Sequence, residues 1–199
     1  MQEKILLSTA YLPPVQYFSL IKSSRAVLIE AKENYIKQTY RNRCYILSSG
    51  GPLLLPVPVY EGSRRKVPIR EVRIDYSKRW QQVHLRAIRA AYGNSPFFDF
   101  YFEELEQIIL WKHECLFDLN DLLLRKVLRM LKIEREISNT TEYAPEVRQT
   151  NDFRYSLTPE KRQEFINRRY LQVFGNEFTS NLSIIDLIFN MGPEAGGYL

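Results

Sequence analysis

The opening thirty residues constrain the fold most, because two short apolar runs flank a turn and a helix-like segment. Lys4–Leu7 and Ala26–Ile29 are apolar and short, as buried strands are. Between them, the turn residues of Tyr11–Pro14 precede a predicted helix over Val15–Ile21. A strand, a helix and a second strand so close in the chain predict a βαβ unit with parallel strands, and therefore an α/β fold.

The next segments predict antiparallel pairing. Arg43–Leu47 and Leu53–Val59 flank Ser48–Pro52, whose serines, glycines and proline are typical of a hairpin turn. Apolar and charged residues then alternate over Val72–Tyr76, which predicts a half-buried strand.

The second half of the chain is predicted to be mainly helical. Ile133–Leu157 has no clear period and is interpreted as a long loop, of the kind that forms lids or binding loops. These patterns predict a single α/β domain over residues 1–199, with a mixed sheet, a strand-rich part over 1–76 and a mainly helical part over 77–199. Helical spacing and end signals predict helices over Trp80–Tyr92, Phe98–Trp111, a segment from Asp118 or Asn120 to Leu131, Pro159 to Gly175, and Leu182–Met191.

The composition is that of an ordinary globular protein, with 199 residues, 45% hydrophobic and 26% charged. Ile5–Ile21 and Cys44–Tyr60 lack charge but contain prolines, and at 17 residues each they are shorter than the about 20 apolar residues of a spanning helix. The apolar start Ile5–Leu7 is too short for a signal peptide. Two cysteines make no disulfide framework. We therefore expect a cytoplasmic protein with no membrane span.

Basic residues are concentrated between Arg25 and Arg89, where 14 basic residues face 5 acidic ones, although the net charge of the chain is only +5. The guanidinium forks of the arginines among them suit phosphate or carboxylate, so one interpretation is a site for an anionic small molecule. The other is a solvated face that pairs with the acidic second half. With no lysine-rich tract or nucleic-acid motif, specific nucleic-acid binding is disfavoured.

Arg41, Asn42 and Arg43 form the strongest binding candidate. If they enter a strand, Arg41 and Arg43 point to one face and Asn42 to the other. Two guanidinium groups on one face would clamp a phosphate or carboxylate. The alternative is a pair of surface arginines that bridge to Glu30 or Glu33.

Three further residues are candidates for the site. His84 is the candidate general base, since histidine exchanges protons near neutral pH, and the alternative is a buried structural histidine. Tyr11 leaves the end of a predicted strand, where α/β folds place ligands, and either stacks on a base or sugar ring or packs in its turn. Arg154, with Asp152, either closes over a site from the long loop or forms a salt bridge.

Metal and cofactor signals are absent from the sequence. His113, Glu114 and Cys115 lack the spacing of a zinc site. No Walker loop, GxGxxG or GxSxG sequence occurs. We therefore expect neither a metal nor a cofactor.

Several motifs together resemble the WbqC-like protein family of bacteria. The resemblance spans nearly the whole chain and implies a transferase of surface-glycan synthesis, since family members occur in clusters for surface polysaccharides and some are described as glycine transferases acting on amino sugars. The motifs are Tyr11-Leu12-Pro13 with Tyr17-Phe18, Tyr40-Arg41-Asn42-Arg43 with Ile46, Val57-Pro58-Val59, Trp80 with His84, Tyr92 with Ser95-Pro96 and Phe98, and Asn181–Leu187.

The resemblance implies transfer of an aminoacyl or acyl group to a nucleotide-linked amino sugar. His84 would act as the base, and Arg41 and Arg43 would hold a phosphate or carboxylate. The alternative is a non-catalytic binding or scaffold protein of the same pathway.

One segment departs from the family pattern. Many members carry His-Gln-Pro-Asn immediately before Tyr-Leu-Pro, where this chain has Leu7, Ser8, Thr9 and Ala10. Chemistry that needs that histidine or glutamine is therefore absent here or is performed by other residues, which slightly favours the scaffold alternative.

Overall fold

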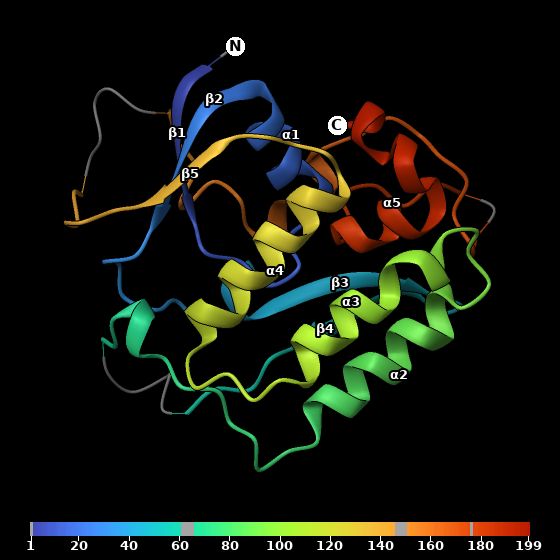
Figure 1. Cartoon of the computed structure of the whole chain (residues 1–199), viewed down its shortest axis with the longest axis horizontal. Coiled ribbons are helices and arrows are strands. Elements are labelled where there is room, and N and C mark those ends of the chain that lie inside the picture. The colour runs from blue at the N-terminus through green and yellow to red at the C-terminus, as the bar shows by residue number, and fades with distance from the viewer. Residues whose placement is uncertain (1, 61–65, 146–150, 176) are drawn as a thin grey trace.

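The computed structural model describes residues 2–60, 66–145, 151–175 and 177–199. Its larger sheet is parallel, with four strands in the order β5-β2-β1-β6, and β1, β2 and β5 are seen side by side in Figure 1. Helix α1 (Val15–Ser23) connects β1 to β2, so the predicted βαβ unit is confirmed. The strands of this sheet are β1 (Gln2–Ser8), β2 (Ser24–Glu30), β5 (Glu136–Asn139) and β6 (Asn151–Asp152).

A hairpin forms a second, antiparallel sheet. Strand β3 (Arg43–Ser48) pairs with β4 (Gly51–Pro56), from Arg43 opposite Pro56 to Ser48 opposite Gly51. Gly51 has a φ of +98°, which allows the tight reversal. The expected single α/β domain with parallel and antiparallel strands is confirmed.

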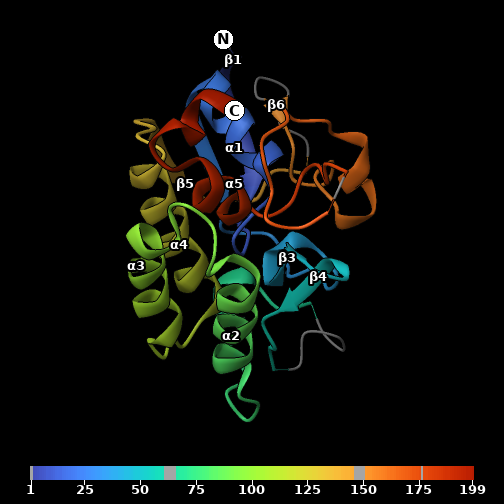
Figure 2. The same cartoon turned by 90° about the vertical axis from the view of Figure 1, so that its right-hand side faces the viewer.

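Helices pack against both sheets, and four of the five α-helices among the residues that the structure describes follow residue 79. In Figure 2, α2 lies between α3 and the hairpin, and it contacts both α3 and β3. No helix within the described residues is long and apolar enough to cross a membrane. The remaining α-helices are α2 (Trp80–Tyr92), α3 (Phe98–Leu110), α4 (Leu116–Met130) and α5 (Ile184–Met191), and 3-10 helices span Tyr40–Asn42, Ile69–Glu71, Pro159–Glu164 and Gly192–Tyr198.

The prediction of a long loop over Ile133–Leu157 is wrong where the structure describes it. This segment contributes β5 and β6 to the parallel sheet, while residues 146–150 lie outside the described ranges. The two strands are short and polar because they form the edges of the sheet. They therefore lack the apolar run by which a buried strand is recognised.

The predicted strand over Val72–Tyr76 is also wrong. The apolar alternation does reflect burial, since Val72 and Ile74 are buried. The backbone, however, makes only single bridges to two different partners, from Ile74 to Val59 and from Arg73 to Cys115.

Two helix predictions need correction. The segment from Pro159 to Gly175 forms only the short 3-10 helix, after which side-chain amides bind the backbone, as where Gln172 both donates to and accepts from Thr179. Helix α4 begins at Leu116, before Asp118, and Asn120 donates instead to the carbonyl of Arg41.

Replacement of Gly192 by alanine should destabilise the protein. Gly192 ends α5 with a φ of +52°, and a Cβ there would overlap the ring of Phe97. We expect Gly192→Ala to lower the free energy of unfolding by about 1–3 kcal/mol in urea unfolding, because both the backbone and the ring must shift. Gly197→Ala is the control, since a Cβ at Gly197 meets nothing within 4 Å. Equal unfolding midpoints for the two variants would contradict the prediction.

Candidate functional site

A hollow between β4 and the start of α2 contains two of the candidate residues, Asn42 and His84. Its volume of about 460 Å³ lies in the range of small-molecule sites. We call it the β4–α2 hollow. Its lining is mostly apolar with a few polar groups, and consists of Asn42, Leu54, Leu55, Pro56, Val57, Pro58, Lys78, Arg79, Trp80, Val83 and His84.

Two buried polar groups of this hollow have no hydrogen-bond partner among the described residues. Trp80 is 5% exposed and its Nε1–H donor is unpaired. Asn42 is 7% exposed; its Nδ2 donates to the carbonyl of Val57 over 2.9 Å, while its Oδ1 acceptor is unpaired. An unpaired buried polar group costs about 1–3 kcal/mol. Both atoms are closed off from solvent in the free protein, so a ligand that accepts from Trp80 and donates to Asn42 would remove that cost only after neighbouring side chains move aside.

The start of α2 adds positive potential to the same hollow. The first N–H groups of a helix lack partners within the helix, and no side chain caps them here, where Arg79 is the N-cap residue. Lys78 and Arg79 both line the hollow. Cations at this end oppose the helix dipole, so the arrangement favours an anionic group beside them.

His84 lies at the base of the hollow, with both ring nitrogens hydrogen-bonded. Nδ1 is 3.0 Å from the hydroxyl of Tyr11, and Nε2 is 3.1 Å from the carbonyl of Pro56. A carbonyl only accepts, so Nε2 carries the hydrogen and Nδ1 accepts from Tyr11. Burial lowers the pKa of His84 to about 4, so its ring is neutral near pH 7. These contacts favour the structural alternative for His84 in the free protein.

Tyr11 is fully buried behind His84. Besides its bond to His84, its ring contacts Trp80 edge-on, with centroids 6.4 Å apart. Burial raises the pKa of Tyr11 well above its ordinary value, so the hydroxyl keeps its proton. Tyr11 therefore supports the hollow from behind, as the packed-turn interpretation expects.

Arg41 does not share a strand face with Arg43, which corrects the predicted geometry. Arg41 lies in the 3-10 turn Tyr40–Asn42, and β3 begins only at Arg43. The Arg41 guanidinium forms two hydrogen bonds to Glu33, at 2.9 and 2.6 Å, and a third to Ser8 at 2.6 Å. The partner is the carboxylate that the alternative interpretation expects, but the pair is buried and not on the surface.

Arg154 occupies a second buried ion cluster at the carboxyl ends of the parallel strands. It donates to Glu30 over 2.8 Å and to Asp152 over 2.6 Å, and also to the carbonyl of Ala144. Burial raises the pKa of Asp152, but the hydrogen bonds from Arg154 outweigh that effect and hold the pKa below its ordinary value. With every nitrogen engaged, Arg154 has no fork free for an added anion.

Between Arg41 and Arg154, the carboxyl edge encloses little space. Near the point where the strand order reverses around β1, a cavity of about 20 Å³ is lined by Ser8, Thr9 and Ala10 among others. That volume suits a single water rather than a substrate. The predicted site residues thus divide: Asn42 and His84 line the β4–α2 hollow, Arg41 and Arg154 line this cavity, and Tyr11 and Arg43 line neither.

Sequence reasoning missed Lys78, Arg79 and Trp80 as site residues. One signal was available, because two cations directly before a helix oppose the preference for acidic residues there. No sequence signal could identify the unpaired indole N–H of Trp80, because its lack of a partner depends on which atoms surround it in the fold. Among the described residues, no three His, Cys, Asp or Glu side chains are grouped so that they could hold a metal ion.

Together, these observations define an α/β protein with a hollow whose volume lies in the range of small-molecule sites. The chain belongs to the WbqC-like protein family, which matches residues 9–167 and 152–198. It is also 28% identical over 229 residues to the uncharacterized protein Rv1507c of Mycobacterium tuberculosis (strain ATCC 25618 / H37Rv), in a match that covers all of this chain and 98% of that protein. No solved structure gives a significant match. The motif residues Asn42, Val57, Pro58, Trp80 and His84 all line the β4–α2 hollow.

The buried neutral His84 should make stability fall in acid. Its pKa in the folded state, about 4, is below the unfolded value of about 6.5, so below pH 6.5 the unfolded chain takes up a proton that the folded chain does not. Between pH 7.5 and 4.5 this group should cost about 2–3 kcal/mol of unfolding free energy. His84→Gln keeps an amide donor and acceptor but does not titrate. Urea unfolding at both pH values should show a smaller acid loss for the variant, and parallel losses would contradict the assignment.

Removal of Arg154 should strongly destabilise the fold. Arg154→Met leaves the buried Glu30 without its countercharge, and we expect a loss of about 3–5 kcal/mol in unfolding free energy. Arg73→Met is the matched control, since Arg73 pairs with Glu114 on the surface and such pairs contribute about 0–1 kcal/mol. A loss of similar size in both variants would show that the buried cluster is not important for stability.

Proposed function

We propose that this protein is a cytoplasmic transferase of surface-glycan synthesis, which moves an aminoacyl or acyl group onto a nucleotide-linked amino sugar bound in the β4–α2 hollow. The observation that carries the proposal is the unpaired donor of Trp80 and unpaired acceptor of Asn42, both buried in a hollow lined by family motif residues. A ligand that pairs with both groups needs one hydrogen-bond acceptor, for Trp80, and one donor, for Asn42, and a sugar has both.

The charges of the hollow fit the anionic part of such a substrate. Lys78, Arg79 and the start of α2 suit a phosphate of the nucleotide carrier or a carboxylate. The apolar wall formed by Leu54, Leu55 and Val83 suits the face of a ring. In the transfer, the sugar amine attacks the carbonyl of an activated acyl donor, an amide bond forms, the donor's leaving group departs and the amine loses a proton to a base.

The role of His84 as that base stays a prediction. Its neutral ring has the protonation state that a base needs. Because both ring nitrogens are hydrogen-bonded, a bound substrate would have to replace the contact with Tyr11 before Nδ1 could take its proton.

A non-catalytic binding protein of the same pathway is the second candidate. Where many family members have a histidine, Leu7 is fully buried and has no group that titrates. The next residue, Ser8, is bound to Arg41 and to the carbonyl of Arg154. A protein of this kind would keep the β4–α2 hollow as a binding site without turnover.

Ligand-induced thermal shifts test the site. We expect nucleotide-linked amino sugars, among a panel with ATP, acyl-CoA and free amino acids, to raise the melting temperature. A ligand at about 100 times its Kd adds about 2.7 kcal/mol, or roughly 5–10 °C for a chain of this length. Trp80→Phe removes the indole donor but keeps an aromatic ring, and should weaken binding about 3- to 10-fold. Trp111→Phe, which changes an exposed tryptophan, is the control. No shift with any ligand, or equal effects of the two variants, would refute the site.

Turnover separates the two candidate functions. Mass spectrometry of the amino sugar after incubation with activated acyl donors should show the mass of one added acyl group. Loss of product in His84→Gln with binding retained supports the base, and an unchanged rate removes His84 from the chemistry. Binding without product for any donor favours the binding protein.

A further inference from the structure

Helix α3 exposes two large aromatic side chains on the outer surface of the protein. Phe100 and Trp111 are 74% and 71% exposed, and Leu110, next to Trp111, is 46% exposed. In Figure 2, α3 lies at the left-hand edge of the molecule. Aromatic side chains are enriched in the contact surfaces of proteins, so their exposure on one helix indicates an interface.

The two rings lie on one line along α3 because of their spacing. Phe100, Glu104, Gln107 and Trp111 are all exposed and follow the helical spacing i, i+4, i+7 and i+11. Trp111 keeps this spacing, since its N–H still donates to the carbonyl of Gln107 over 3.2 Å. We call these four residues the α3 stripe. The buried face of the helix lies opposite and consists of Phe98, Phe102, Leu105 and Ile109.

The α3 stripe is complementary to a second copy of itself. Its steps of four, three and four residues are those by which helices pack side by side. If two copies of α3 pack antiparallel, with Phe100 against the partner's Trp111, the two-fold axis repeats that contact at the other end. Glu104 and the partner's Gln107 then meet between the two pairs of rings.

The charges of α3 fit the same antiparallel arrangement. Asp99 precedes Phe100 and Lys112 follows Trp111, so each Asp99 lies at the level of the partner's Lys112. Both residues are exposed, and neither forms an ion pair within the described ranges. Glu104, in the middle of the stripe, already has a countercharge, because it pairs with Lys126 of α4.

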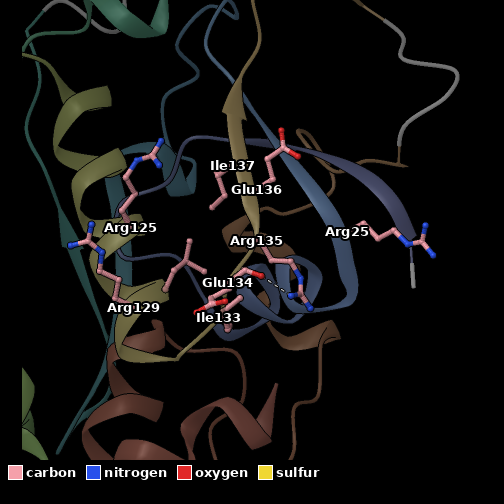
Figure 3. A pocket seen from close by; sticks show the side chains of 9 residues that line it. Arg25, Arg125, Arg129, Ile133, Glu134, Arg135, Glu136 and Ile137 are labelled. Atoms are coloured by element: carbon pink, nitrogen blue, oxygen red, sulfur yellow. Dashed lines mark hydrogen bonds between the residues drawn. The ribbon is translucent and has the colours of Figure 1, made fainter.

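The neighbouring helix α4 presents charges rather than aromatic rings near its end. A hollow of about 710 Å³ there is bordered by Arg125 and Arg129 of α4 and by Arg135, which precedes β5 (Figure 3). The guanidinium groups of these arginines point in different directions, so they do not form one site for an anion. The aromatic rings on α3 are therefore the stronger candidate for an interface.

We propose that two copies of this chain associate through α3 as an antiparallel two-fold dimer, with Phe100 on the partner's Trp111 and Asp99 beside the partner's Lys112. Burial of the rings provides the attraction, and the charges select the orientation. Two helices of 13 residues make a small contact, so the dimer is weak and forms at high protein concentration. The inference is independent of the transferase proposal, because none of these residues lines the β4–α2 hollow.

Sedimentation velocity of the full chain tests the dimer, at protein concentrations up to about 0.5 mM, where weak interfaces associate. Phe100→Ser with Trp111→Ser should weaken dimerisation about tenfold or more, because it removes the central aromatic contacts. The control is Ile166→Ser with Leu171→Ser, which removes two apolar side chains of similar exposure, 80% and 86%, and should leave dimerisation unchanged. Melting temperatures check that both variants fold.

Charge reversal tests the orientation. Asp99→Lys brings two lysines together at each end of the dimer, and Lys112→Asp brings two aspartates together, so each variant alone should dimerise about tenfold more weakly. A mixture of the two variants pairs opposite charges again and should form a mixed dimer.

Three outcomes overturn the proposal. The first is a chain that stays monomeric, which would favour a different protein as the partner of α3. The second is an equal effect of the two serine double variants. The third is a pair of charge reversals that leave dimerisation unchanged or that fail to associate when mixed.

Discussion

Buried pairing of two arginines with carboxylates holds the carboxyl ends of the parallel strands together. Arg154, directly after β6, pairs with Glu30 at the end of β2, while Arg41 pairs with Glu33 and reaches Ser8 at the end of β1. Each buried charge has an opposite charge beside it, so these side chains can be buried at a much lower cost in free energy than unpaired ions. The ends of three strands and the turn that carries Arg41 are thereby fixed relative to one another.

That fixed turn also connects the sheet to the candidate site. Arg41 faces the ion cluster, and the next residue, Asn42, faces the β4–α2 hollow. The backbone here is held from two further sides, because Asn120 donates to the carbonyl of Arg41 and Val57 donates to that of Asn42. Arg41, predicted as part of an anion clamp, therefore holds the turn that carries Asn42 into the hollow, and Lys78 and Arg79 place positive charge beside it.

Periodicity in the sequence was sufficient for the elements with a clear apolar pattern. Helix α2 is predictable because burial on one side repeats at the helical period, and the βαβ unit and the hairpin because short apolar runs are separated by turn residues. The sequence indicates Asn42 and His84 as candidates, and both line the β4–α2 hollow. The unpaired indole of Trp80 could not be predicted, because hydrogen-bond partners depend on which atoms the fold brings together. Arg41 and Asn42 line two different cavities because they lie in a 3-10 turn. The sequence could not predict this turn, because the residues there read as the start of a strand.

Strands β5 and β6 are short and polar, and this also affects how the protein behaves at high concentration. The outer strands of the parallel sheet are only four and two residues long and largely polar. Long apolar edges act as templates on which other chains add strands, whereas short polar ones offer few backbone groups and no apolar face. The buried strands β1 and β2, which are rich in Leu, Ile and Val, are thus flanked by segments that protect the chain from aggregation through its sheet.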